Sequence, residues 1–243
     1  MKFCFGLRQF KFRYQSKHNP ILQADEIDIP SGTVVSVIGP SGSGKSTLVG
    51  CLGLLRSIKN SDGQILFHGS AGVQDYSTLS TEQSEDLRRR RFGFALQNSY
   101  LLPHLTVLDN LIIPLALKGV AEKHRRAMGM EFLKCMPDLL ERQNAPVSQI
   151  SGGQKQRIGV LRALIHDPDV VFADEPFSSL DQENEHLMLK SLLDWQRGEL
   201  TPTTSSHSPD RTLFLVTHDL NVAATISQYR LAIEKGQLNL TCN

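Results

Sequence analysis

The chain has 243 residues, which suits one domain, or one domain carrying a subdomain, with a sizeable buried core. Lys and Arg number 26 against 25 Asp and Glu, a formal net charge of +1, so no global basicity points to nucleic acid as a partner. No apolar run reaches the roughly 18 residues that span a membrane, and the charged N-terminus argues against a signal peptide. The 4 cysteines lack metal-ligand spacing and fit a reducing compartment.

The predicted strands fall into two kinds. Residues 3–14 alternate loosely between apolar and polar, which predicts a half-exposed strand, and 27–29 and 65–67 look like further strands of an antiparallel sheet. Residues 34–38 are a β-branched run before a glycine, which suits a strand buried on both faces of a parallel sheet. Similar buried runs, separated by helical stretches, predict an α/β body with crossover helices. These runs cover residues 93–96, 170–172, 213–216 and 231–233.

Three other segments have a distinct composition. Residues 107–149 look helical, with Pro114, Gly119 and Pro137 as punctuation, and predict a helical subdomain inserted into the α/β body. Residues 198–211 are polar and rich in Ser, Thr and Pro, which is typical of a surface loop, and a disordered one. The basic run 88–91 directly precedes an apolar stretch and indicates a solvated helix end.

A phosphate-binding loop follows the buried run 34–38. Its glycines allow a tight turn whose N–H groups can wrap a phosphate at the start of the next helix. In such loops the lysine, here Lys45, reaches the β- and γ-phosphates, and the hydroxyl of the next residue, Ser46, ligates Mg²⁺. The predicted ATP-binding residues are Gly39, Pro40, Ser41, Gly42, Ser43, Gly44, Lys45, Ser46 and Thr47.

Two acids, Asp174 and Glu175, close another buried run. A carboxylate at the carboxyl end of a parallel strand points toward the crevice where α/β proteins bind nucleotides. Asp174 is therefore predicted to hold Mg²⁺ through water, and Glu175 to act as general base on the attacking water. An isolated pair of acids could equally be a strand cap, and the phosphate loop upstream is what favours the catalytic interpretation.

The segment Ser151-Gly152-Gly153-Gln154 lies between the phosphate loop and the acids, and could by itself be an ordinary helix N-cap. The order of all three motifs resembles the ATP-binding-cassette (ABC) ATPases over about residues 8–238. That resemblance implies a phosphate-loop NTPase core with a mostly parallel sheet, an N-terminal antiparallel β subdomain and an inserted helical subdomain. It also implies that this segment offers helix amides and the serine hydroxyl to the γ-phosphate of ATP held by a second copy of the chain.

The same resemblance assigns further positions. Gln97 would sense Mg²⁺ and the attacking water, Asp181 belongs to the loop crossing the dimer interface, and His218 would contact the γ-phosphate. A lone histidine is more often structural. Tyr14 lies where the family keeps an aromatic residue that stacks on adenine, and Phe12 is a rival because alternation puts both on one face.

Residues 92–111 look most like the ATPases of the lipoprotein-release and macrolide-export group. Phe177 and Leu161 depart from that group, and the segment from Glu175 to Asp181 resembles importer ATPases instead. The resemblance implies a peripheral ATPase on the cytoplasmic face of the inner membrane, driving separate permease subunits. An importer motor or a nucleotide-gated regulator of a membrane scaffold are the alternatives. DNA-repair and translation members are disfavoured, because the long inserts or fused cassettes that mark them are absent.

A groove near Gln97 and the helical subdomain is expected to receive a helix of the membrane partner. Tyr100, Leu101 and Leu102 are its candidate lining, although all three could be local core.

Overall fold

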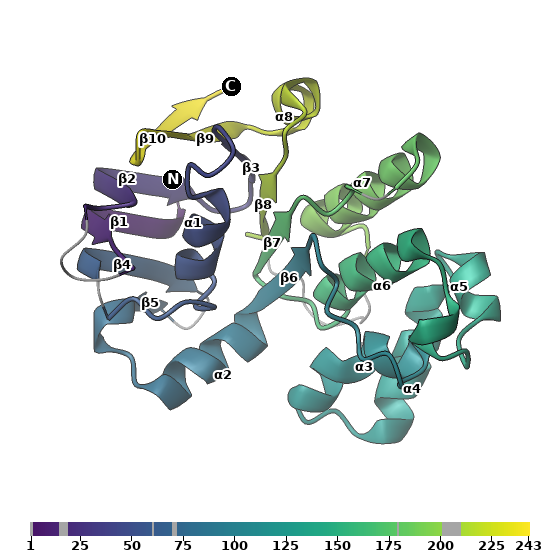
Figure 1. Cartoon of the computed structure of the whole chain (residues 1–243). Helices are drawn as coiled ribbons and strands as arrows, with labels where there is room; N and C mark the ends of the chain where they lie inside the picture. Colours follow the sequence, from purple (N-terminus) through teal and green to yellow (C-terminus); the bar gives the residue numbers. More distant parts are fainter. Residues whose placement is uncertain (1, 15–18, 60, 70–71, 179, 201–209) are drawn as a thin grey trace. The chain divides into compact units, whose positions relative to one another are not determined.

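The computed structural model describes residues 2–14, 19–59, 61–69, 72–178, 180–200 and 210–243 (Figure 1). The chain divides into two compact units. The first joins Met1–Arg88 to Ser208–Asn243, and the second is Arg89–His207. Most of the predicted polar loop 198–211 lies outside the described residues.

An antiparallel sheet forms the N-terminal part of the first unit, as the alternating sequence predicts. Strand β1 (Phe3–Phe12) pairs antiparallel with β2 (Leu22–Pro30) and with β4 (Ser61–Gly69), and β5 (Gly72–Asp75) extends the sheet beyond β4. Phe5 lies at the centre of its core, with ring centroids 5.3 Å from Phe67 and 5.8 Å from Phe214. Tyr76, in the short 3-10 helix η1 (Tyr76–Thr78), closes this aromatic cluster.

The rest of the first unit is built around a buried parallel strand. Strand β3 (Val34–Ile38) lies between β8 (Thr212–Val216) and β9 (Tyr229–Glu234) and is parallel to both. Strand β10 (Gln237–Cys242), which the sequence did not indicate, pairs with β9 and touches β2 at one bridge. Helix α1 (Lys45–Leu52) follows β3, and helix α8 (Leu220–Ile226) follows β8. The phosphate loop and the segment after β8 therefore leave the same edge of a parallel sheet.

The second unit places two parallel strands beside a set of helices. Strand β6 (Phe92–Leu96) pairs with β7 (Val170–Asp174), and the ring of Phe172 stacks on Phe94 at 5.6 Å. Helix α6 (Gly152–Leu164) packs on β6 and also contacts α3 and α7. The remaining helices are α3 (Val107–Leu117), α4 (Glu122–Leu133), α5 (Pro137–Glu141), the 3-10 helix η2 (Val147–Gln149) and α7 (Gln182–Arg197).

Two sequence expectations change in detail. Pro114 does not end a helix, because α3 runs through it to Leu117 despite the backbone donor that proline lacks. Gly119, with φ of 82°, follows that end as predicted. The basic run does form the end of helix α2 (Thr81–Arg91), but it is not simply solvated. Arg88 donates to the Leu54 carbonyl at 2.8 Å, and Arg91 pairs with Asp169 at 3.2 Å.

Among the described residues, none of the helices combines the length and the apolar character needed to cross a lipid bilayer.

Candidate nucleotide-binding site

The phosphate loop connects β3 to α1 and curves around the ammonium group of Lys45. Lys45 Nζ donates to the carbonyl oxygens of Gly39 at 2.8 Å and Pro40 at 3.0 Å, and the side chain is buried. A buried cation thus lies inside the turn. Gly44, the residue before α1, has φ of 105° and no side chain to occupy the amides of the first helical turn. Those amides are directed at whatever the loop encloses.

The loop fits a phosphate group by its chemistry. Ser43 Oγ is buried and forms no hydrogen bond to any described residue, so a polar donor already lies desolvated in the loop. A Cβ at Gly39 would lie 2.7 Å from that oxygen, so a larger residue would fill the turn. Pro40, Ser41, Gly42 and Ser46 remain exposed, which leaves the outer side of the loop accessible. A phosphate could accept from these donors and from Lys45 together.

His218 lies at the same sheet edge as the phosphate loop. Val37 and Val216 are register partners in the parallel pair β3–β8, so the chain leaves both strands side by side. The turn that carries His218 is held on each side of it. Asp219 N donates to Thr217 Oγ1 at 3.1 Å, and the Asp219 carboxylate caps α8 by accepting from Asn221 N at 2.8 Å. The imidazole is exposed at this edge.

The second unit brings Gln97, Asp174 and Glu175 to one edge. Leu96 and Asp174 are register partners at the ends of β6 and β7, so Gln97 and Glu175 are the next residues of two adjacent parallel strands. Glu175 has φ of 48°, a left-handed conformation that is uncommon for a residue with a side chain. Backbone strain of this kind costs energy and concentrates at functional sites, so it supports a specific task for Glu175.

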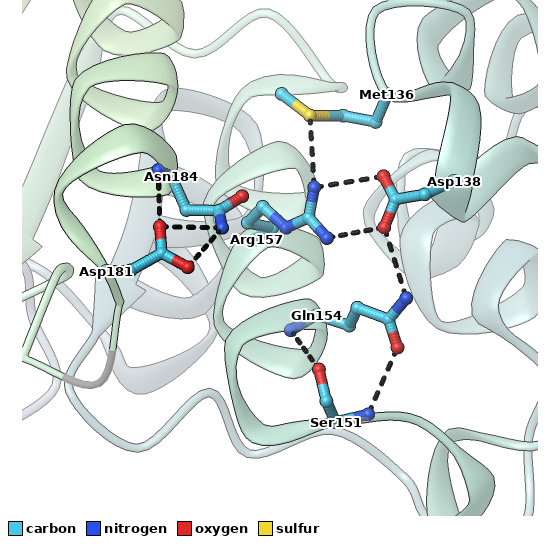
Figure 2. Close-up of polar contacts among 7 residues, drawn as sticks. All are labelled: Met136, Asp138, Ser151, Gln154, Arg157, Asp181 and Asn184. Atoms are coloured by element: carbon cyan, nitrogen blue, oxygen red, sulfur yellow. Dashed lines mark hydrogen bonds and ion pairs between the residues drawn. The ribbon is translucent and has the colours of Figure 1, made fainter.

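The segment 151–154 forms a capping box at the start of α6 (Figure 2). Ser151 Oγ accepts from Gln154 N at 3.1 Å, and Gln154 Oε1 accepts from Ser151 N at 3.1 Å. Ser151 and Gly152 are exposed, and a Cβ at Gly152 would meet nothing within 4 Å. The helix N-terminus is therefore ordered by its own side chains while its outer face stays open. Both the N-cap interpretation and the phosphate-binding interpretation fit this geometry.

Asp138 and Arg157 support this helix N-terminus through Gln154. The sequence analysis did not indicate a role for Asp138. Asp138 accepts two hydrogen bonds from Arg157, at 2.9 and 2.5 Å, and one from Gln154 Nε2 at 3.1 Å (Figure 2). Partial burial works to raise the pKa of Asp138, but the hydrogen bonds from Arg157 and Gln154 outweigh it and hold the pKa below its ordinary value. The carboxylate is thus kept ionised and fixes the rotamer of Gln154.

Asp181 is the N-cap of α7. Its Oδ1 accepts from Asn184 N at 2.9 Å, and the Asn184 amide side chain donates to both carboxylate oxygens (Figure 2). The Asn184 backbone N–H is the main reason that the pKa of Asp181 lies below its usual value. Ser179, part of the same predicted interface loop, lies outside the described residues.

The structure separates the two candidate aromatic residues for adenine. Phe12 is the last residue of β1 and its side chain is buried, whereas Tyr14 is 47% exposed. The rings meet edge to face, with centroids 5.5 Å apart and an interplanar angle of 81°. A buried ring offers no face to a ligand, so the geometry favours Tyr14 over Phe12.

A groove of about 300 Å³ lies beside the start of α6 within the second unit. Its wall carries Tyr100, which is 71% exposed, and the neighbouring Leu102 is 42% exposed. Arg162 donates to the carbonyls of Ser99 and Tyr100 and holds this wall in place. Exposure of Tyr100 and Leu102 argues against the local-core interpretation, and Leu101 is half-buried. Gln97, Asn98, Ser99, Leu101, Gly152, Lys155 and Gln156 complete the lining.

Asn110 fixes the backbone of residues 102–106, which follow the groove, through side-chain hydrogen bonds. The sequence analysis gave it no role. It is fully buried; its Nδ2 donates to the carbonyls of Leu102, Leu105 and Thr106, and its Oδ1 accepts from Leu102 N at 2.8 Å. Asn110→Ala removes the acceptor of Leu102 N and one donor from each of the three carbonyls, which keep a backbone donor, so we expect a loss of about 1–3 kcal/mol in the free energy of unfolding. Chemical denaturation measures it. Asn144→Ala, at an exposed asparagine of the same unit, should cost little. Equal losses would contradict this role of Asn110.

Comparison with known proteins assigns the family. The family model described as ABC transporter matches residues 22–178. The macrolide export ATP-binding/permease protein MacB of Pasteurella multocida is 35% identical over 214 residues, which are 88% of this chain and 30% of that protein. The glutamine transport ATP-binding protein GlnQ of Escherichia coli is 34% identical over 232 residues, covering 94% of this chain and 88% of that protein. The chain thus spans about a third of the length of its MacB relatives.

Solved structures agree with that assignment. The ATP-binding cassette MJ0796, in a dimeric post-hydrolysis state bound to ADP and Pi, superposes with a TM-score of 0.81 at 27% identity and 98% coverage of both chains. The chain belongs to the ABC transporter family. Its fold is that of the ABC ATP-binding cassettes, and its enzyme class is that of the ABC ATPases, as the three motifs predicted.

Proposed function

We propose that this chain is the ATP-hydrolysing motor of an export or lipoprotein-release transporter, acting on a separate membrane permease. The observation that carries the proposal is the open N-terminus of α6, ordered by the Ser151–Gln154 capping box and backed by Asp138. An open helix N-terminus is suited to bind a second phosphate, which supports a cassette whose ATP bridges two copies of the chain. The MacB relatives support the export class.

In the first unit, the loop from Gly39 to Thr47 binds the phosphates through its amides. The Lys45 ammonium group donates to loop carbonyls in this structure and would donate to the β- and γ-phosphates when nucleotide is bound. Tyr14 stacks on the base, a contact that contributes about 1–3 kcal/mol. His218 donates to the γ-phosphate from the turn after β8.

In the second unit, the edge of β6 and β7 carries the reaction. Glu175 takes a proton from the attacking water, and Gln97 orients that water. Asp174 and Gln97 are the Mg²⁺ ligands proposed for this unit, and Ser46 is the one proposed for the first unit; oxygen donors of these kinds suit this ion. Mg²⁺ bound there would neutralise charge on the β- and γ-phosphates.

Two copies of the chain are proposed to close head to tail around two ATP molecules. Ser151, Gly152, Gly153 and Gln154 of one copy then meet the γ-phosphate held by the other, with Asp181 at the interface. Hydrolysis removes the charge that joins the copies, so the pair reopens. The dimeric state named for MJ0796 supports this arrangement.

The groove beside α6 is the proposed docking site of the permease, which would place the motor peripherally on the cytoplasmic face of the inner membrane. An exposed aromatic residue next to an exposed leucine is a typical anchor for an apolar helix. Tyr100→Glu should reduce capture of the permease about tenfold or more while the isolated chain still hydrolyses ATP. Leu117→Glu, at another exposed leucine of the same unit, is the matched control and should retain capture. Equal capture by both variants would contradict docking at this groove.

The test of the proposed function is to identify that partner. Tagged Glu175→Gln chain is used to capture proteins from solubilised native membranes with ATP and Mg²⁺, and mass spectrometry names them. A permease with four predicted spans and a large periplasmic domain supports the export or lipoprotein-release class. A six-span permease with a binding protein would favour an importer motor, the second candidate, which the GlnQ relative supports. Absence of any membrane partner would overturn both.

A further inference from the structure

Gln154 uses the two ends of its side-chain amide for two different partners (Figure 2). Its Oε1 accepts from Ser151 N at 3.1 Å, which closes the capping box, and its Nε2 donates to Asp138 Oδ2 at 3.1 Å. An ionised carboxylate can only accept hydrogen bonds, so Asp138 requires the nitrogen end of the amide to face it. The oxygen end is thereby directed to Ser151 N. Without Asp138, the amide could turn over and present a donor to the Ser151 donor.

The position of Asp138 is itself fixed from two sides. Asp138 lies in the first turn of α5, between the buried side chains of Met136 and Leu139. Arg157, one turn beyond Gln154 on α6, is buried and donates to both oxygens of the Asp138 carboxylate. Separating such a pair would leave a buried cation without its counter-charge, which is strongly unfavourable. The acceptor for Gln154 is therefore held at a defined place.

The capping box decides which donors remain at the start of α6. It occupies the backbone N–H groups of Ser151 and Gln154. The N–H groups of Gly152 and Gly153, in the first turn, have no partner within the helix. The Ser151 hydroxyl oxygen accepts from Gln154 N, which leaves its proton to be donated to a ligand. Three donors are thus arranged before any phosphate binds, and donors arranged in advance need no reorganisation during the reaction.

We propose that Asp138 is a positioning residue for hydrolysis, which acts through Gln154 to hold these donors ready for the γ-phosphate of the nucleotide bound by a second copy of the chain. The inference rests on the proposed function, in which the start of α6 meets that phosphate. Asp138 belongs to the second unit, whereas the phosphate loop belongs to the first. Loss of Asp138 should therefore slow hydrolysis without weakening ATP binding to a single copy.

The first experiment measures hydrolysis and ATP affinity separately in Asp138→Ala, which removes the acceptor of both Gln154 and Arg157. The maximal rate of hydrolysis should fall about 10- to 100-fold. The affinity for a fluorescent nucleotide at low protein concentration should be unchanged. Asp109→Ala is the matched control, because Asp109 also accepts from an arginine, Arg126, at 2.8 Å in the same unit. It should hydrolyse ATP at the native rate. A native rate in Asp138→Ala, or equal losses in the two variants, would overturn the inference.

The second experiment mixes chains to identify which half of the shared site Asp138 serves. In a pair with Glu175→Gln, the Asp138→Ala copy keeps its own base and meets the intact Ser151 of its partner, so hydrolysis should recover well above the sum of the separate variants. In a pair with Ser151→Arg, both α6 N-termini are damaged, so hydrolysis should not recover. A general folding defect would recover with neither partner, and a defect in the phosphate loop would recover only with Ser151→Arg. Either result would overturn the inference.

The mixture of Glu175→Gln with Ser151→Arg separates this inference from the function beneath it. If that mixture recovers hydrolysis and the mixture of Glu175→Gln with Asp138→Ala does not, only the role of Asp138 is overturned. If neither recovers, the shared site fails and the inference fails with it. Asp138→Asn replaces Asp138→Ala in these mixtures if the alanine variant does not fold. It keeps the shape of the side chain but turns one acceptor into a donor, so it should lose less activity and behave in the same way when mixed.

Discussion

Glu175→Gln is expected to lower the rate of ATP hydrolysis by about 10²–10⁴-fold while ATP binding survives. Glutamine has the shape of glutamate but cannot take a proton from the attacking water. The phosphate contacts come from the Gly39–Thr47 loop, which the substitution does not alter. ATP should therefore stay bound and hold two copies together. Phosphate release measures the first effect, and size-exclusion chromatography with and without ATP measures the second.

The control for that variant is Glu141→Gln, which changes an exposed carboxylate of the same unit in the same way. It should hydrolyse ATP at the native rate. Full turnover by Glu175→Gln would mean that another group is the base, and the left-handed backbone at Glu175 would then have no catalytic meaning.

Ser151→Arg is expected to stop hydrolysis without weakening ATP binding to a single copy. The large cation would block the open face at the start of α6, where the γ-phosphate of the partner copy is proposed to bind. The affinity of the monomer should be unchanged, because none of its proposed phosphate contacts involve Ser151. Fluorescent-nucleotide titration at low protein concentration and a phosphate-release assay measure the two quantities.

Ser151→Arg also removes a helix cap, which can cost about 0.5–2 kcal/mol of stability. Thr106→Ala is the matched control, since Thr106 caps α3 by accepting from Asp109 N at 3.0 Å in the same unit. It should lose comparable stability and keep its hydrolysis rate. Hydrolysis by Ser151→Arg at the native rate would rule out a phosphate site at this helix.

The parallel strands and the phosphate loop could be predicted because they depend on local sequence. The β-branched run 34–38 has no alternating polar residues, which is typical of a strand buried on both faces. The glycines that follow it are typical of a phosphate-binding loop. Gln97 was assigned by the family resemblance, and the polarity of the parallel strands explains why it shares an edge with Glu175. Strand β10 was missed, although Gln237–Cys242 alternates polar and apolar residues and follows a turn at Lys235 and Gly236, both with positive φ.

The residues that support the site from outside it could not be predicted. Their contacts are with residues distant in sequence, or depend on burial that the sequence does not reveal. Asp138 lies 19 positions from Arg157, and no pattern links a single acid to a single arginine at that spacing. In the sequence, Asn110 cannot be distinguished from an exposed polar residue of a helix, because its burial is not known.

The central claim is that each ATP site is shared between two copies of the chain, and mixing two inactive variants tests it most directly. Glu175→Gln and Ser151→Arg chains are combined before ATP is added, and phosphate release is measured. In a mixed pair, Glu175 of one copy and Ser151 of the other rebuild one intact site. The mixture should hydrolyse ATP well above the sum of the separate variants. A mixture as inactive as its components would contradict a shared site.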